Sequence, residues 1–230
     1  MTQISTQNLE QYLPVREVKT THGSISGIFM FNNEPVKFES TLERDFLVRL
    51  STYDHVLNVI SQPMSIDFQY PTNDRTYQYT PDFLVNYKGS PYPYRKSQLI
   101  EVKPYKKLKE NITKWKPKFK KATQCSKELD FVFHIYDEHR IRDQRWKNAM
   151  FLRRYEKMDF DEEVSNWIIN NLKNAELMTF DYLLKRHFLT RESQANGISH
   201  IWHLVSTKRI VCDLSLPFTI HTEFWINENE

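Results

Sequence analysis

Apolar residues in the first part of the chain switch between two spacings, one typical of helices and one typical of strands. Leu42, Phe46 and Leu50 recur every four residues, which predicts a helix that begins after Ser40. Short runs rich in aromatic and β-branched residues predict strands. The order of elements is that of an α/β domain over residues 36–155, with a mixed sheet flanked by helices. The expected strands are 57–60, 65–70, 76–87 with a break at Pro81, 97–102 and 130–136, and further helices are expected at 103–121 and 139–155.

Residues 156–230 have a different pattern, in which three short helices precede two strands. The first helix is expected at 161–172, and Thr179 and Thr190 are placed to cap the next two. Helices followed by a hairpin are the element order of a winged helix, so we expect a small winged-helix-like C-terminal domain suited to partner binding. The strands of its hairpin are expected at 209–214 and 219–226, and the polar residues 1–35 are interpreted as an N-terminal arm.

The composition excludes several classes of protein. Of the 230 residues, 40% are hydrophobic and 27% are charged, which is typical of a folded chain. With four glycines, the sequence contains no glycine-rich phosphate-binding loop. Two isolated cysteines, Cys125 and Cys212, indicate a reducing compartment. The start of the chain lacks the pattern of a secretory signal, and no apolar run approaches the ~20 residues of a membrane span. We therefore expect a cytoplasmic protein without a membrane segment.

Charge is distributed unevenly between the two expected domains. Residues 1–155 contain 25 Lys/Arg and 17 Asp/Glu, a net charge of +8, whereas residues 156–230 contain 7 and 12, a net charge of −5. A basic domain can face nucleic acid, whereas an acidic one repels the DNA backbone. The N-terminal half is thus a candidate for DNA binding, and the C-terminal half is better suited to a protein partner.

Basic residues are concentrated in the expected helix that follows residue 102. Nine lysines and a single acid, Glu110, lie between Lys103 and Lys121, with Trp115 among them. Such a lysine face can contact phosphates, although a solvated helix surface gives the same pattern. Pro117 is expected to kink or divide this helix. The candidate DNA-binding residues are Lys106, Lys107, Lys109, Lys114 and Lys116.

The residues that best indicate chemistry lie at the ends of two expected strands. Asp82 follows Pro81 at the start of one strand, and Glu101, Val102 and Lys103 end another. If the strands are adjacent, Asp82 faces Glu101. Two carboxylates and the Val102 carbonyl form a hard oxygen site suited to Mg²⁺, for which Mn²⁺ can substitute. The Lys103 ammonium would lie beside a metal-bound water or a phosphate, as hydrolysis of a phosphodiester requires.

Glu43 has two interpretations that the sequence alone leaves open. It lies on the first expected helix, where it could be a third metal ligand. It also follows Ser40 by three residues, and this spacing is that of a capping box, in which the glutamate hydrogen-bonds back to the start of the helix.

Taken together, these motifs resemble the PD-(D/E)xK nuclease superfamily, whose fold is that of restriction endonucleases. Their order over residues 35–140 more closely resembles the N-terminal domain of the TnsA family, the endonuclease subunits of heteromeric transposases. The family also has a winged-helix-like C-terminal domain, which agrees with the pattern of residues 156–230. The motifs are Ser-Thr-Leu-Glu-Arg-Asp-Phe-Leu at residues 40–47, Gln62-Pro63, Tyr-Thr-Pro-Asp-Phe-Leu at 79–84 and Ile-Glu-Val-Lys at 100–103.

The resemblance implies a specific activity. TnsA-like proteins cleave the 5′, non-transferred strand at transposon ends, while a DDE-type transposase, TnsB, cuts and joins the 3′ ends. Their C-terminal domain contacts TnsC, an AAA+ ATPase. Such proteins act on double-stranded DNA in the bacterial cytoplasm. On this chain, the implied metal ligands are Glu43, Asp82 and Glu101, the catalytic lysine is Lys103, and Gln62 is a polar residue near the site.

Two other functions use the same motifs. A free-standing nuclease, such as a restriction or junction-resolving enzyme, would have the same active site but would cleave without partners. A nuclease fold without turnover would serve as a DNA-binding or scaffolding module. Because all of the candidate catalytic residues are present, the sequence favours an active enzyme.

Overall fold

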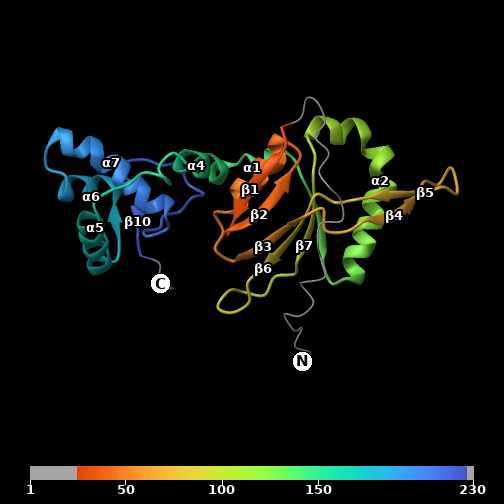
Figure 1. Cartoon of the computed structure of the whole chain (residues 1–230), viewed down its shortest axis with the longest axis horizontal. Coiled ribbons are helices and arrows are strands. Elements are labelled where there is room, and N and C mark those ends of the chain that lie inside the picture. The colour runs from red at the N-terminus through yellow and green to blue at the C-terminus, as the bar shows by residue number, and fades with distance from the viewer. Residues whose placement is uncertain (1–24, 227–230) are drawn as a thin grey trace. The chain divides into compact units, whose positions relative to one another are not determined.

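The computed structural model describes residues 25–226 and contains two compact units, which divide between Arg142 and Asp143 (Figure 1). The sequence pattern had placed this boundary at residues 155 and 156. The difference arises because Asn148, which is buried, donates hydrogen bonds to the carbonyls of Leu214 and Leu216 (2.9 and 2.6 Å). These bonds attach the segment after residue 142 to the C-terminal unit.

The first unit is built on a four-stranded mixed sheet, as the sequence predicts. Its strand order is β3–β6–β7–β8, with antiparallel neighbours except for the parallel pair β7–β8. Phe83, Val85 and Ile100 point to one face and Leu84 and Leu99 to the other, and all five are fully buried. The sheet therefore has a hydrophobic core on both faces. The strands are β3 (Val56–Ser61), β6 (Phe83–Tyr87), β7 (Gln98–Val102) and β8 (Val132–Tyr136).

One face of the sheet is covered by helix α1 (Thr41–Leu50) and by a hairpin of β1 (Gly27–Phe31) and β2 (Glu34–Phe38) (Figure 1). The hairpin turns at Asn32 and Asn33, which both have positive φ angles of 48° and 66°, as a tight hairpin turn requires. The end of the expected N-terminal arm is thus folded, because Phe31 and Val36 are buried in the core. Residues 1–24 of that arm lie outside the described part of the chain.

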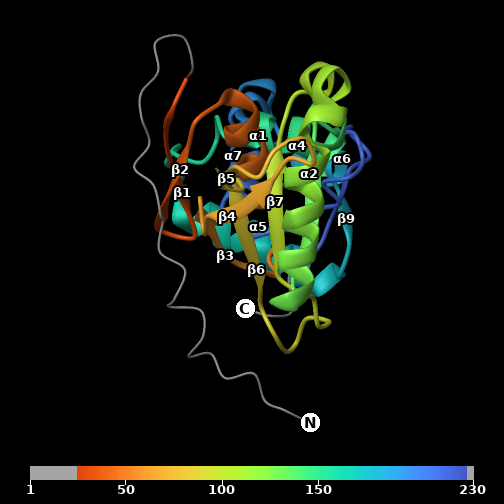
Figure 2. The same ribbon diagram turned by 90° about the vertical axis from the view of Figure 1, so that its right-hand side faces the viewer.

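The other face is covered by helix α2 (Tyr105–Glu128), with the β4–β5 hairpin beside it (Figure 2). Residues 76–87 form two strands, as expected, but these do not pair with each other: β5 (Thr76–Tyr79) pairs with β4 (Ile66–Gln69), whereas β6 joins the main sheet. Helix α2 continues through Pro117, so the proline does not divide the helix, and the alternative of a kink stays a prediction. Phe119, Ala122 and Ser126 are buried after the proline, and their packing offsets one lost helical hydrogen bond.

Two helices form where the sequence pattern predicts one at 139–155, and the boundary between the units falls between these two helices. Helix α3 (Glu138–Ile141) ends at Arg142, and α4 (Gln144–Leu152) begins anew. Asp143 causes this restart, because its side chain accepts a hydrogen bond from the Trp146 N–H (3.0 Å) and thereby caps α4.

The second unit contains the three expected helices around its own hydrophobic core. Thr179 and Thr190 cap α6 and α7, as predicted. The expected hairpin is reduced to a single bridge between Val211 and Trp225, and β10 pairs instead with β9. The winged-helix assignment therefore stays a prediction. The elements are α5 (Glu162–Ala175), β9 (Met178–Thr179), α6 (Phe180–His187), α7 (Arg191–Ser206) and β10 (Glu223–Phe224).

Every helix within residues 25–226 is too short or too polar to span a membrane.

Gly197 provides a test of the packing in the second unit. It lies inside α7, where a Cβ atom would overlap the ring of Phe188. Alanine normally stabilises a helix interior by about 1 kcal/mol relative to glycine. We expect the opposite sign here: Gly197→Ala should lower the free energy of unfolding by about 1–3 kcal/mol, because overpacking outweighs helix propensity. Denaturant titration measures this, with exposed Asn196→Ala as the control. A stabilised Gly197→Ala protein would contradict the described packing.

Candidate active site

The strand register places Asp82 beside the end of β7. The Asp82 N–H donates to the Ile100 carbonyl (2.9 Å), and the Asp82 carbonyl accepts from the Gln62 N–H (2.8 Å). Asp82 is thus fixed between the ends of β3 and β7, directly before β6 begins. The condition stated for the sequence, that the two strands be adjacent, is met: β6, which follows Asp82, pairs with β7, which contains Glu101.

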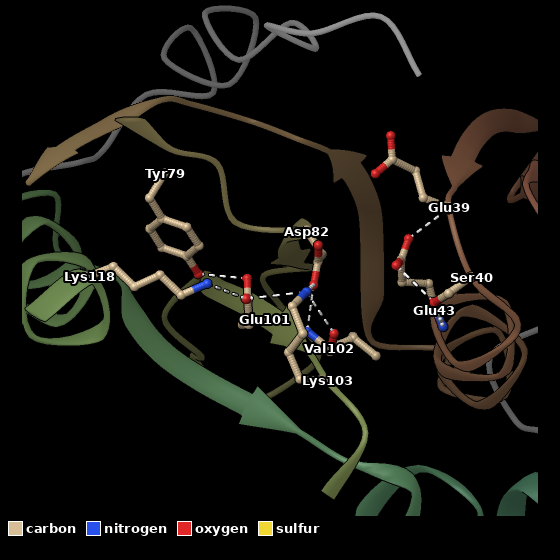
Figure 3. A network of polar contacts seen from close by, with 9 residues as sticks. All are labelled: Glu39, Ser40, Glu43, Tyr79, Asp82, Glu101, Val102, Lys103 and Lys118. Carbon is tan, nitrogen blue, oxygen red and sulfur yellow. Dashed lines mark hydrogen bonds and ion pairs between the residues drawn. The ribbon is translucent and has the colours of Figure 1, made fainter. Parts of the chain in front are cut away.

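The side chains of Asp82, Glu101 and Lys103 meet at this end of the sheet (Figure 3). The Asp82 Oδ2 atom accepts hydrogen bonds from the Val102 N–H (2.6 Å) and from the Lys103 Nζ (3.2 Å). The same ammonium group donates to the Val102 carbonyl (3.0 Å) and lies 3.2 Å from Glu101 Oε1. Three oxygen atoms, one each from Asp82, Glu101 and Val102, therefore surround the Lys103 ammonium group.

The charges in this cluster depend on one another. Burial, together with the neighbouring Glu101 carboxylate, raises the pKa of Asp82 to about 8, although Lys103 acts in the opposite direction. Burial by itself would lower the pKa of Lys103, but Asp82 and Glu101 outweigh it and the net pKa is raised. The cluster thus holds its cation strongly, and its carboxylates favour positive charge beside them.

Glu43 is engaged in capping α1. Its Oε1 accepts from the Ser40 hydroxyl (2.8 Å) and its Oε2 from the Glu39 N–H (2.7 Å), while Ser40 Oγ accepts from the Glu43 N–H (3.2 Å). Burial raises the pKa of Glu43, and these hydrogen bonds oppose that effect. The structure therefore contains the hydrogen bonds of the helix cap that the Ser40–Glu43 spacing suggested. Figure 3 shows Glu43 across from Asp82, but residues 25–226 contain no group of three or more His, Cys, Asp or Glu residues arranged to hold a metal.

Two contacts of Glu101 were not anticipated from the sequence. The Tyr79 hydroxyl donates to Glu101 Oε2 (2.7 Å), and Lys118 Nζ donates to Oε1 (3.1 Å). The Lys118 ammonium also lies over the rings of Tyr79, Trp115 and Phe119, 4.5–4.9 Å from their centroids. Because Lys118 belongs to a lysine-rich helix, the sequence suggested a solvent-facing charge. Its spacing from Trp115, three residues earlier, was the available signal that it lies on the apolar face.

Gln62 lies next to the cluster through its backbone hydrogen bond to Asp82. It adopts a positive φ of 49°, and its buried side-chain Oε1 has no hydrogen-bond partner among residues 25–226. A chemical role for this side chain stays a prediction. The same holds for the five candidate DNA-binding lysines, which are all exposed on α2: Lys106, Lys107, Lys109, Lys114 and Lys116.

Comparison with known protein families settles the relationship of the chain. Residues 53–138 match the model of the TnsA-like endonuclease N-terminal domain, and residues 140–214 match that of the TnsA endonuclease C-terminal domain. The chain belongs to the TnsA endonuclease family. In this TnsA-family protein, Asp82, Glu101 and Lys103 lie inside the matched N-terminal segment, whereas Glu43 precedes it. No curated protein matches the sequence.

Lys118→Met should show how much the charge beside Glu101 contributes to stability. Glu101 is 1% exposed, and loss of one charged partner leaves it with only Tyr79 and Lys103. We expect the free energy of unfolding to fall by about 1–3 kcal/mol. Denaturant titration measures this loss.

Lys116→Met is the matched control for this substitution, because Lys116 is exposed on the same helix and should change stability by less than about 0.5 kcal/mol. The double variant Glu101→Gln/Lys118→Met should lose less than the sum of the single variants. Equal effects at positions 116 and 118 would refute the assigned pairing.

Proposed function

We propose that this protein is the metal-dependent DNA endonuclease subunit of a transposase. It cleaves the 5′, non-transferred strand at the ends of a transposon during cut-and-paste DNA transposition. The proposal rests on one observation above all: Asp82, Glu101 and the Val102 carbonyl surround a single cationic group, the Lys103 ammonium.

The same oxygen atoms fit a divalent metal ion. Mg²⁺ prefers hard oxygen ligands, and this cluster, two carboxylates and a carbonyl, already accommodates a positive charge. Asp82, Glu101 and Val102 would hold the ion, with Glu43 as a further carboxylate, and Mn²⁺ would substitute for Mg²⁺. A bound ion would lower the pKa of a water molecule and polarise the scissile phosphate.

The residues of the chain itself have distinct tasks in this reaction. Lys103, which is partly exposed, would stabilise the negative charge that develops on the phosphate. Tyr79 and Lys118 would keep the Glu101 carboxylate in place, because they hold one oxygen each. Gln62 fixes the backbone of Asp82.

The partners follow from membership in the family. A TnsA endonuclease belongs to a transposition complex that acts on DNA. We propose that a TnsB-type DDE transposase processes the 3′ ends, and that a TnsC-type AAA+ ATPase binds the winged-helix-like C-terminal unit. The net charge of −5 in residues 156–230, and of −2 in the whole unit (residues 143–230), supports a protein partner there. The site of action would be the bacterial cytoplasm.

Asp82→Ala tests the proposed activity. In a reaction with the TnsB-type partner and transposon-end DNA, we expect 5′-strand cleavage to fall by at least about 100-fold, because a metal ligand is lost. Cleavage of the 3′ ends should persist. Asp74→Ala, at an exposed position in the loop between β4 and β5, should cleave normally.

Normal 5′ cleavage by Asp82→Ala would disprove the assignment of the site. Cleavage by the wild-type chain without any partner would instead favour a free-standing nuclease. If crystals soaked in Mn²⁺ gave no anomalous density near Asp82 and Glu101, and the protein never cleaved, a binding or scaffolding module would be the better description.

Glu43→Gln separates the two tasks assigned to Glu43. Glutamine also serves in a capping box, so the free energy of unfolding should change by less than about 0.5 kcal/mol. The substitution removes the charge that acts on Asp82, and we expect 5′ cleavage to fall at least about 10-fold. Full cleavage by a stable Glu43→Gln protein would show that Glu43 is only a helix cap.

A further inference from the structure

A cavity of about 940 Å³ lies between helix α2 and the β4–β5 hairpin, within the first unit. The catalytic candidates Asp82, Glu101 and Lys103 do not line it. The hairpin contributes mainly neutral polar and aromatic groups, and the helix contributes basic groups. The neutral polar lining residues are Gln69, Tyr70, Thr72 and Thr76 on the hairpin and Thr113 and Gln124 on α2. Lysines of α2 also line the cavity.

Four lysines on α2 line this cavity: Lys114, Lys116, Lys120 and Lys121. Only one acidic residue, Asp67, lies among the lining residues. Within residues 25–226, none of the four ammonium groups forms an ion pair, in contrast to Lys118 and Lys103, which pair with Glu101. The wall of the cavity therefore has a positive charge that no ion pair within residues 25–226 neutralises.

The spacing of these charges suits a polyanion. Residues 114 to 121 span about 10 Å along a helix at 1.5 Å per residue. At 3.4 Å per nucleotide step, this length corresponds to about three steps of one strand of duplex DNA. The hydroxyls of Thr72 and Thr76 on the facing hairpin can donate hydrogen bonds to phosphate oxygens, as in other protein–DNA contacts.

The cavity is connected to the active site through the elements that form it. Tyr79, at the end of β5, and Lys118, on α2, both contact Glu101. DNA held between α2 and the hairpin would therefore contact the same two elements that hold Glu101.

We propose that this groove binds the phosphate backbone of DNA that flanks the cleaved position. The proposal rests on the proposed function, because that function makes DNA the ligand. It also divides the lysines of α2 into two groups. Lys114 and Lys116 share the groove with Lys120 and Lys121, whereas Lys106, Lys107 and Lys109 lie outside it.

Two triple variants test the groove, since each removes three positive charges from the chain. Lys114→Gln/Lys120→Gln/Lys121→Gln changes the groove, and Lys37→Gln/Lys88→Gln/Lys147→Gln, at exposed positions outside the groove and outside the candidate DNA-binding residues, is the control with the same net charge. Binding of the full chain to a fluorescent DNA duplex is measured by anisotropy over a series of salt concentrations.

For the groove variant, we expect at least a 10-fold weaker affinity. The slope of log K against log salt should be shallower by about 2–3, since each lost phosphate contact contributes about 0.9. The control variant should change affinity by less than 3-fold. Equal effects of the two variants, or an unchanged slope for the groove variant, would overturn the proposal.

Failure of this proposal and failure of the proposed function give different results. If the groove variant binds DNA like the wild-type protein, while wild-type protein cleaves 5′ strands and Asp82→Ala does not, the groove is refuted and the function stands. If the groove variant binds weakly, but Asp82→Ala cleaves like the wild-type protein, the groove stands and the assigned active site is refuted.

Discussion

The burial of the Glu101 carboxylate is the constraint on which the rest of the first unit depends. An ionised carboxylate that is 1% exposed costs several kcal/mol unless partners compensate it. Its partners come from three different elements: Tyr79 from the β4–β5 hairpin, Lys118 from α2 and Lys103 from the end of β7. The hairpin, the helix and the sheet must therefore occupy their observed positions for this one side chain to be tolerated, which links the fold directly to the chemistry.

That link explains why the cluster is suited to catalysis. Backbone hydrogen bonds fix the main chain of Asp82 between the ends of β3 and β7, and the Val102 N–H and the Lys103 ammonium hold its carboxylate. Burial and the neighbouring Glu101 carboxylate raise the pKa of Asp82, so positive charge beside Asp82 is favoured. Within the protein, the Lys103 ammonium group supplies this positive charge. In the proposed reaction, the same preorganised charge would act on a metal ion and a phosphate, and little reorganisation would be needed.

The sequence predicted the features that depend on local spacing. The capped helix α1, the strands around Asp82 and Glu101, and the caps at Thr179 and Thr190 all follow from periodicity and side-chain chemistry. It did not predict features decided by distant contacts. The hairpin around Asn32 packs into a core formed by later elements, α2 passes through Pro117 because of its buried face, and Lys118 turns inward because a buried carboxylate lies opposite.

Helix α2 shows how one sequence of lysines serves two environments. With 3.6 residues per turn, Trp115, Lys118, Phe119 and Ala122 fall on one face, and this face packs on the sheet. Thr113, Pro117, Lys120, Lys121 and Gln124 fall on another, which lines the groove. The two faces differ in what neutralises their charge: a buried carboxylate on the first, and no group of the described chain on the second. The inward lysine therefore maintains the active site, whereas the outward lysines are available for an anionic ligand.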